Sequence, residues 1–179
     1  TYLCTPYDLE SAFMLDRLDI AAFKISSTDT TNIPFLRGVS DFRRPTILST
    51  GLCDIGDVST AVNTLSGVKD RLALLHCTSE YPSPPEESNL RAIQTMAQAF
   101  NVPVGYSDHS AGIGVAPYAV ILGAAIIEKH FTISRSFSGP DHMASVEPAE
   151  LSALIKQIHS ALATLGDGVK KLTPSERQN

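Results

Sequence analysis

One local pattern recurs along the chain and limits the fold more than any other feature of the sequence. A short apolar run that favours a β-strand is followed by a polar cluster and then by a helical stretch, and this unit repeats about every 21 to 33 residues. The β-like runs lie at residues 3–8, 22–29, 46–51, 72–82, 102–109 and 124–132, and the clearest helical stretches at 8–18, 54–65, 86–100 and 147–165. Because helical connections of this length place successive strands side by side in parallel, the sequence predicts an α/β protein with a parallel sheet.

The polar clusters favour one of the two common architectures of such a sheet. In a doubly wound sheet, polar residues gather at the point where the strand order reverses, whereas in a (β/α)8 TIM barrel they follow every strand. Here six consecutive strand ends carry hydroxyls, carboxylates, an amine or imidazoles. We therefore expect six of the eight units of a TIM barrel. Since a piece of this kind leaves two sheet edges unpaired, we expect residues 1–179 to be part of a longer barrel with two units upstream.

The composition limits the classes of partner. With 43% hydrophobic residues, the 179-residue chain can bury the core of one domain. Its net charge of −5 and the lack of a Lys/Arg cluster argue against nucleic acid or an anionic membrane as partner, because both need a basic surface. The odd number of cysteines, Cys4, Cys53 and Cys77, is typical of free thiols in the reducing cytoplasm. We therefore expect a cytoplasmic protein that acts on small molecules.

Two histidines form the best candidate metal pair. His109 and His130 each close a β-like run. Because side chains alternate along a strand, Ser107 shares one face with His109, and Glu128 shares one face with His130. If the two strands are parallel neighbours, the imidazoles converge at one strand end. The alternative is that each histidine only satisfies a hydrogen bond where its strand meets a loop.

The strand ends also supply groups that hold a phosphate, namely one cation and many neutral donors. These groups are Lys24, Ser27, Ser49, Thr50, Ser79, Ser107 and the backbone N–H of Gly51. For each serine, a role as helix cap or turn residue is the alternative. Lys24 is harder to explain in that way, because it lies inside an apolar run, and a buried amine needs an anion nearby or loses its proton.

Six segments of the chain carry a family resemblance. In order, they read FKISSTDTTNIP, ILSTG, LLHCTSEYPSPPEESNLRAI, VGYSDHSAGI, IIEKHFT and GPDHMASVEP. Together they resemble the catalytic barrel of the sialic acid synthase family, and the resemblance covers almost the whole chain. That family condenses phosphoenolpyruvate with an N-acetylated aminosugar to make nine-carbon nonulosonic acids, with release of phosphate. The resemblance implies a transferase of this kind, without the first two βα units and without the C-terminal antifreeze-like domain that caps the partner's site in a homodimer.

The resemblance also implies roles for individual residues. His109 and His130 match the two protein ligands of a divalent metal, manganese or magnesium. Tyr81 and Asp141 match residues that contact the aminosugar, although Asp141 is also explained as a turn residue of GPDH. The residues that match the phosphoenolpyruvate site are Thr5, Lys24, Ser27, Ser49 and Ser107, with Ser79 at a position where some members have asparagine.

Two carboxylates are the expected catalytic groups. Glu128 and Asp29 are assigned to orienting the attacking water, stabilising the cation that develops at C2 of phosphoenolpyruvate and moving protons. Asp29 stands where other members have aspartate or glutamate. For Glu128, the alternative is a structural ion pair with a neighbouring lysine.

Other functions stay open at this point. One is a Schiff-base aldolase with Lys24 as nucleophile, which needs no metal. Another is a non-catalytic sugar- or phosphate-binding module, or an inactive fragment. Within the synthase interpretation, the acceptor is N-acetylmannosamine or a diacetamido trideoxy sugar of the legionaminic or pseudaminic type, and HCTSEYP is more similar to the sialic and legionaminic branches.

Overall fold

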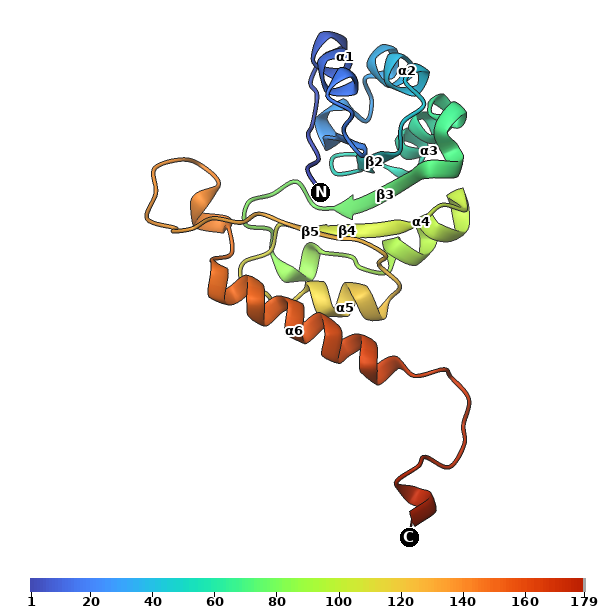
Figure 1. Cartoon of the computed structure of the whole chain (residues 1–179), viewed down its shortest axis with the longest axis vertical. Helices are drawn as coiled ribbons and strands as arrows, with labels where there is room; N and C mark the ends of the chain where they lie inside the picture. Colours follow the sequence, from blue (N-terminus) through green and yellow to red (C-terminus); the bar gives the residue numbers. More distant parts are fainter. Residues whose placement is uncertain (179) are drawn as a thin grey trace.

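The centre of the molecule is a parallel sheet of five strands in sequential order. The computed structural model describes residues 1–178 (Figure 1). The strands are β1 (Phe23–Ile25), β2 (Thr46–Ser49), β3 (Leu72–Cys77), β4 (Val104–Asp108) and β5 (Ile127–Lys129). Every strand pairs in parallel with the next one along the chain, in the order β1-β2-β3-β4-β5. The order does not reverse within residues 1–178, so the doubly wound alternative is wrong for this part of the chain.

The sheet is curled into a half-barrel. Lys24 of β1 and Glu128 of β5 belong to the two edge strands, yet their charged groups lie 3.4 Å apart. A flat sheet would separate its first and fifth strands by four spacings of about 4.8 Å. The five strands therefore curve around a common concave face. A closed barrel of eight strands is not present in the described part of the chain.

The first of the six expected strands is reduced to a single bridge. Cys4 pairs in parallel with Phe23, and its carbonyl accepts a hydrogen bond of 3.2 Å from the backbone N–H of Lys24. Pro6 follows two residues later and has no N–H with which to continue the ladder. The run at 3–8 is therefore placed beside β1 without forming a regular strand, and the sheet has five strands instead of six.

Residues 1–178 contain six α-helices, of which α1 precedes β1 and the others connect or follow the strands. They are α1 (Leu9–Arg17), α2 (Ile33–Asp41), α3 (Ile55–Thr64), α4 (Ala92–Phe100), α5 (Ala116–Ile121) and α6 (Pro148–Leu165). The expected helices at 8–18, 54–65 and 147–165 agree with α1, α3 and α6. Asp8 and Asp54 cap the first two of these helices. Asp8 accepts a hydrogen bond from one backbone N–H of the first turn, and Asp54 accepts from two.

The helix expected at 86–100 begins later than the sequence predicts. A short 3-10 turn at Pro85–Glu87 comes first, and the α-helix starts only at Ala92. Between them, Asn89 has a φ of 39°, which a right-handed helix does not allow. From Ala92 to Phe100 the prediction is confirmed, and Ile93, Met96 and Phe100 are the buried residues of α4.

The core lies between the sheet and the helices on its convex side (Figure 1). Phe23, Ile25 and Leu74 point from the strands into this layer and are fully buried. Leu36 of α2 and Ile93 of α4 pack against the same layer. Burying each such side chain contributes about 1.5–3 kcal/mol, so this side of the sheet stabilises the fold and leaves the concave side for polar groups. Within residues 1–178, every helix is too short or too polar to traverse a lipid bilayer.

Candidate active site

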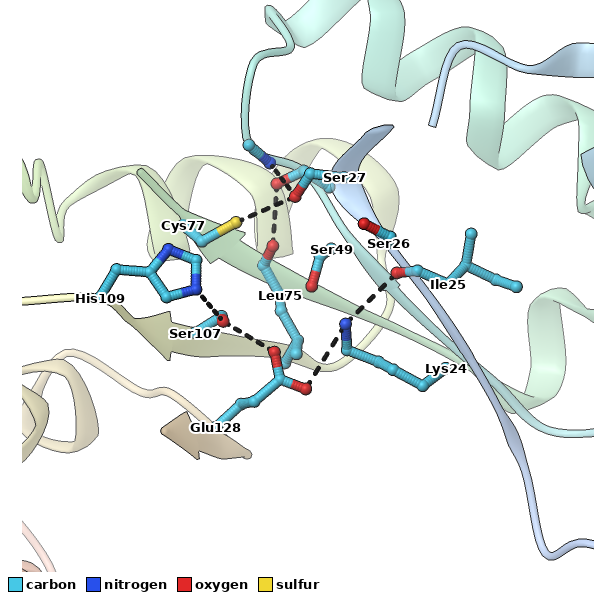
Figure 2. Close-up of polar contacts among 12 residues, drawn as sticks. Lys24, Ile25, Ser26, Ser27, Ser49, Leu75, Cys77, Ser107, His109 and Glu128 are labelled. Atoms are coloured by element: carbon cyan, nitrogen blue, oxygen red, sulfur yellow. Dashed lines mark hydrogen bonds and ion pairs between the residues drawn. The ribbon is translucent and has the colours of Figure 1, made fainter. Parts of the chain in front are cut away.

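A polar cleft of about 450 Å³ opens at the carboxyl ends of the strands, on the concave side of the sheet (Figure 2). It gathers nearly all the site residues that the sequence predicts. Those from the first two polar clusters and β2 are Thr5, Lys24, Ser27 and Ser49. Those from the later strands and loops are Tyr81, Ser107, His109, Glu128, His130 and Asp141. Residues from both ends of the chain thus meet in one concavity.

The two histidines lie side by side. Each directly follows its strand, β4 or β5, and the ring centroids of His109 and His130 are 5.5 Å apart at an interplanar angle of 71°. Nδ1 of His109 is 2.7 Å from the carbonyl oxygen of Thr78. Since a carbonyl oxygen only accepts, Nδ1 carries the proton and Nε2 keeps a free lone pair. Burial, aided by the neighbouring His130, lowers the pKa of His109 and favours this neutral form.

Ser107 links the histidine to a carboxylate. Its Oγ donates a hydrogen bond of 2.7 Å to Oε1 of Glu128 and lies 3.3 Å from Nε2 of His109 (Figure 2). A hydroxyl group has one proton, which here goes to the carboxylate. The lone pair on Nε2 of neutral His109 therefore faces an oxygen that offers it no hydrogen, and it is available to a cation.

The donor set around the histidines suits an open divalent metal site. Imidazole nitrogens bind divalent transition metals, and Oδ2 of Asp141 lies 3.9 Å from Nδ1 of His130. Within residues 1–178, no group of three or more His, Cys, Asp or Glu side chains is close enough to surround an ion. The two adjacent imidazoles, with a free lone pair on Nε2 of His109, fit a divalent metal whose other positions would be filled by water or substrates, an open arrangement of the kind that Lewis-acid catalysis needs.

Tyr81 covers both imidazoles. Its ring lies 4.2 Å from the ring of His109 at a tilt of 34°, and 5.3 Å from that of His130 at 75°. Partial burial, together with nearby negative groups, raises the pKa of its phenol. The hydroxyl group therefore keeps its proton at neutral pH and can donate to a ligand.

Lys24 is the cation of the cleft, and Glu128 supplies the anion that it needs. The two groups are 3.4 Å apart, with 15% of the lysine side chain and 38% of the glutamate side chain exposed. The ion pair considered as an alternative for Glu128 is thus present. The carboxylate still faces the cleft, with one oxygen held by Ser107 and the other by Lys24 (Figure 2).

The hydroxyl cluster beside Lys24 is arranged around one turn. Oγ of Ser27 accepts a hydrogen bond of 2.9 Å from the N–H of Gly51 and lies 3.3 Å from Sγ of Cys77. Its own proton stays available for the sulfur or for a bound anion. Thr50 does not take part, because its hydroxyl donates to the carbonyl of Leu75 at 2.9 Å. Its role is to join the end of β2 to β3.

Besides Thr50 and Gly51, two predicted site residues lie outside the cleft lining, Asp29 and Ser79. Asp29 is buried and accepts a hydrogen bond of 3.1 Å from the side chain of Asn32, which caps α2. It ends the 3-10 turn Ser27–Asp29, in which each residue is rotated by about 120° from the one before, so Ser27 and Asp29 point in different directions. Ser79 packs closely against Gly51.

Two residues that the sequence analysis did not single out line the cleft. They are Tyr7, in the exposed segment before α1, and Ser26, next to Ser27. Both belong to the polar ends of the β-like runs at 3–8 and 22–29. Their position at the end of a β-like run could have identified them as cleft residues. Their residue types alone could not, because Tyr and Ser are also common in ordinary loops.

Comparisons with known proteins give this arrangement a context. The model of the NeuB family matches residues 1–170. N,N'-diacetyllegionaminic acid synthase from Campylobacter jejuni is 47% identical over 99% of this chain and 54% of its own length. N-acetylneuraminate-9-phosphate synthase from Mus musculus is 36% identical over 90% of this chain and 45% of its own length. The chain therefore spans about half the length of these curated relatives.

A solved structure supports the same relationship. Sialic acid synthetase from Leptospira borgpetersenii, crystallised with citrate, superposes with a TM-score of 0.91 at 38% identity. The superposition covers 97% of this chain and 61% of that protein. A truncated 3-deoxy-D-arabino-heptulosonate 7-phosphate synthase from Thermotoga maritima, with a TM-score of 0.76 and 12% identity, shares the fold.

Proposed function

The chain belongs to the NeuB family, and we propose that its protein is a nonulosonic acid synthase that condenses phosphoenolpyruvate with an N-acetylated aminosugar and releases phosphate. One observation carries the proposal. A pair of imidazoles and a cluster of hydroxyls around one lysine share a single cleft. The imidazoles can hold a metal that polarises an aldehyde oxygen, and the lysine with its hydroxyls can bind a phosphate.

The phosphate of phosphoenolpyruvate is assigned to the side of the cleft that holds Lys24. Its ammonium group offsets the phosphate charge, and the hydroxyls offer neutral donors around it. Ser27 is well suited because its oxygen already accepts from Gly51, which leaves its own proton for the ligand. The proposed phosphoenolpyruvate ligands are Thr5, Lys24, Ser27, Ser49 and Ser107, all of which line the cleft. Ser107 donates to the phosphate only after its hydroxyl turns away from Glu128.

The aminosugar is assigned to the side of the cleft that holds the histidines. A manganese or magnesium ion held by His109 and His130 would supply Lewis-acid polarisation of the aldehyde. Tyr81 would donate from its phenol to the sugar, and Asp141 would accept from a sugar hydroxyl. The aldehyde carbon then lies between the imidazoles and the phosphoenolpyruvate side, where C3 of phosphoenolpyruvate can attack it.

Glu128 is the carboxylate that we assign to the second half of the reaction. Attack by C3 leaves positive character at C2, which a carboxylate stabilises and which water then quenches before the C–O bond to phosphate breaks. Ser107 and Lys24 hold the two oxygens of Glu128, so its position is fixed before the substrates bind. We assign this role to Glu128 rather than to Asp29, the other expected candidate, because Asp29 bonds to Asn32 and does not line the cleft.

The relatives favour one type of acceptor. Legionaminic acid synthases from Campylobacter jejuni and Legionella pneumophila are 47% and 43% identical to this chain, whereas the pseudaminic acid synthase from Campylobacter jejuni is 36% identical. We therefore propose a diacetamido trideoxy sugar of the legionaminic type as acceptor, with N-acetylmannosamine as the second candidate. The complete protein is proposed to act as a homodimer in the cytoplasm.

Phosphate release by the complete natural protein tests this function. Phosphoenolpyruvate is supplied with each candidate aminosugar in turn, with manganese present or removed by chelation. Metal-dependent release with one sugar is the expected result and names the substrate. If a folded protein that binds manganese releases no phosphate with any sugar, the synthase proposal is wrong. Trapping of a substrate adduct by borohydride would instead support an aldolase that uses Lys24.

A further inference from the structure

An ion pair joins β4 and β5 one residue before each histidine. Asp108 and Lys129 are register partners in the parallel pairing of these strands, and they directly precede His109 and His130. Nζ of Lys129 lies 3.1 Å from Oδ2 of Asp108. Within residues 1–178, no hydrogen bond reaches Oδ2 of Asp108. The positive charge of Lys129 therefore offsets the cost of burying this negatively charged oxygen.

Lys129 holds the chain on both sides of His109. Besides its contact with Asp108, its ammonium group donates a hydrogen bond to the carbonyl oxygen of Ser110. The other carboxylate oxygen of Asp108 accepts from the backbone N–H of Ser110 at 2.9 Å and from its hydroxyl at 2.6 Å. Lys129, which precedes His130, therefore binds both neighbours of His109, Asp108 and Ser110.

The pair lies outside the cleft. Because side chains alternate along a strand, Asp108 and Lys129 point to the face opposite Ser107 and Glu128, which line the cleft. Side-chain exposure is 0% for Asp108 and 4% for Lys129. Neither group can reach a ligand in the cleft from this position.

Stability alone does not account for a pair of this kind. Removing two charges from water costs about as much as their attraction returns, and well-packed apolar residues of similar volume often give equal or better stability. What apolar residues cannot supply is the set of directed bonds to Ser110. These bonds hold the residues next to His109 and His130 in place.

We propose that Asp108 and Lys129 are positioning residues that hold the imidazoles of His109 and His130 at the spacing a divalent cation requires. This inference rests on the proposed metal-dependent function. The pair acts through the backbone of the two histidines, in the way that groups behind a metal ligand orient it.

The test uses a double variant that leaves the net charge unchanged. Asp108→Val combined with Lys129→Met removes one negative and one positive charge, together with the acceptor of both bonds from Ser110 and the donor to its carbonyl, and replaces both side chains by apolar ones of similar size. The affinity of the complete protein for Mn²⁺ is measured by electron paramagnetic resonance, and folding is followed by circular dichroism. We expect a folded double variant whose Kd for Mn²⁺ is about 10- to 100-fold higher.

A control variant separates positioning from a general loss of stability. Arg44→Met removes an ion-pair network with Asp16 and Asp19 at the end of α1, away from the cleft. It should lower the unfolding temperature and leave the Kd for Mn²⁺ within about twofold, which is less than 0.5 kcal/mol. A double variant that is folded and binds Mn²⁺ like the wild type would overturn the proposal.

A second measurement needs no metal. In the wild-type protein, the bond to Thr78 keeps His109 in the Nδ1–H form, which two-bond ¹H–¹⁵N spectra of labelled histidine detect. With its flanking residues released, His109 in the double variant should show a mixture of tautomers, and an unchanged single tautomer would contradict the proposed positioning. If the wild type bound no Mn²⁺ at all, the metal-dependent function would be wrong, while the tautomer comparison would still decide whether the pair holds His109.

Discussion

Gly51 and Ser79 fit together only because residue 51 has no side chain. A Cβ atom at this position would lie 2.1 Å from Oγ of Ser79, and 3.0 Å from both Oγ of Ser27 and Sγ of Cys77. The absence of a side chain lets the backbone N–H of Gly51 approach Ser27 to 2.9 Å. The close approach of this turn thus builds part of the proposed phosphate site.

We expect Gly51→Ala to weaken both the fold and the binding of phosphoenolpyruvate. The hydroxyl of Ser79 can rotate away, but Ser27 and Cys77 also crowd the added methyl group. Overpacking of this kind costs about 1–3 kcal/mol. Urea unfolding followed by circular dichroism measures the loss of stability, and the KM for phosphoenolpyruvate should rise in parallel.

Two further variants check this explanation. Ser79→Ala removes the nearest clashing atom, so the double variant with Gly51→Ala should regain part of the lost stability. Gly114→Ala is the matched control, because a Cβ there meets no atom within 4 Å and its φ is not in the left-handed region. Unfolding of Gly51→Ala at the same urea concentration as the wild type would mean that the turn has room to relax.

Lys24 and Glu128 should affect different steps of the reaction. Lys24→Met removes the cation for the phosphate, and losing a hydrogen bond to a charged group costs about 1.5–3 kcal/mol, or roughly 10- to 150-fold in kcat/KM for phosphoenolpyruvate. Glu128→Gln keeps the shape and the bond to Ser107 but loses the charge, so kcat should fall by about 10²- to 10⁴-fold. Lys69→Met, at an exposed position, is the control and should leave both constants unchanged. Equal effects of all three variants would contradict these assignments.

The convergence of the two histidines could be predicted from the sequence, because it depends only on local rules. Side chains alternate along a strand, and neighbouring parallel strands keep their ends level. His109 and His130 each follow a strand directly, and the register of Ser107 with Glu128 places the rings 5.5 Å apart. The same rules predicted the parallel sheet and most of the cleft lining.

Features that depend on curvature or on turn geometry could not be predicted in this way. The contact between Lys24 and Glu128 joins the two edge strands and exists only because the sheet curls. The direction of Asp29 is set by a 3-10 turn, whereas the sequence pattern predicts a β-like run through that residue. The first predicted strand does not form beyond the bridge at Cys4, because Pro6 has no N–H for the ladder. The polar residues of this segment still lie beside the cleft, as the sequence predicts.

The protein should lose stability as the pH falls below about 6.5, the ordinary pKa of histidine. Nε2 of His76 donates to the carbonyl oxygen of Ser88 at 2.9 Å, and burial lowers the pKa of this ring. A lowered pKa means that the unfolded chain binds the proton more readily than the folded one, so stability is fully present above the ordinary pKa and decreases below it. His109 contributes in the same direction.

Urea unfolding between pH 8 and pH 5.5 measures this dependence. His76→Gln keeps a donor for Ser88 and removes the titration, so its stability should decline less steeply on acidification. His159→Gln is the control, because His159 is exposed on α6. An identical pH dependence in His76→Gln and the wild type would assign the effect to other groups.

Tyr81 combines two roles that two substitutions can separate. Its ring lies 4.2 Å from that of His109, and its hydroxyl is the proposed donor to the aminosugar. Tyr81→Phe keeps the ring and loses the hydroxyl, a hydrogen bond worth about 0.5–1.5 kcal/mol, so the KM for the sugar should rise about 2- to 12-fold while the Kd for Mn²⁺ stays unchanged.

Tyr81→Ala should alter both quantities, because it also removes the aromatic contact with the imidazoles. Such contacts contribute about 0.5–1.5 kcal/mol, which corresponds to a roughly 2- to 12-fold weaker affinity for Mn²⁺. Tyr118→Ala, on the exposed side of α5, controls for loss of an aromatic ring elsewhere on the surface. If Tyr81→Phe weakened Mn²⁺ binding as much as Tyr81→Ala, the hydroxyl rather than the ring would support the metal site, and the assignment of the phenol to the sugar would fail.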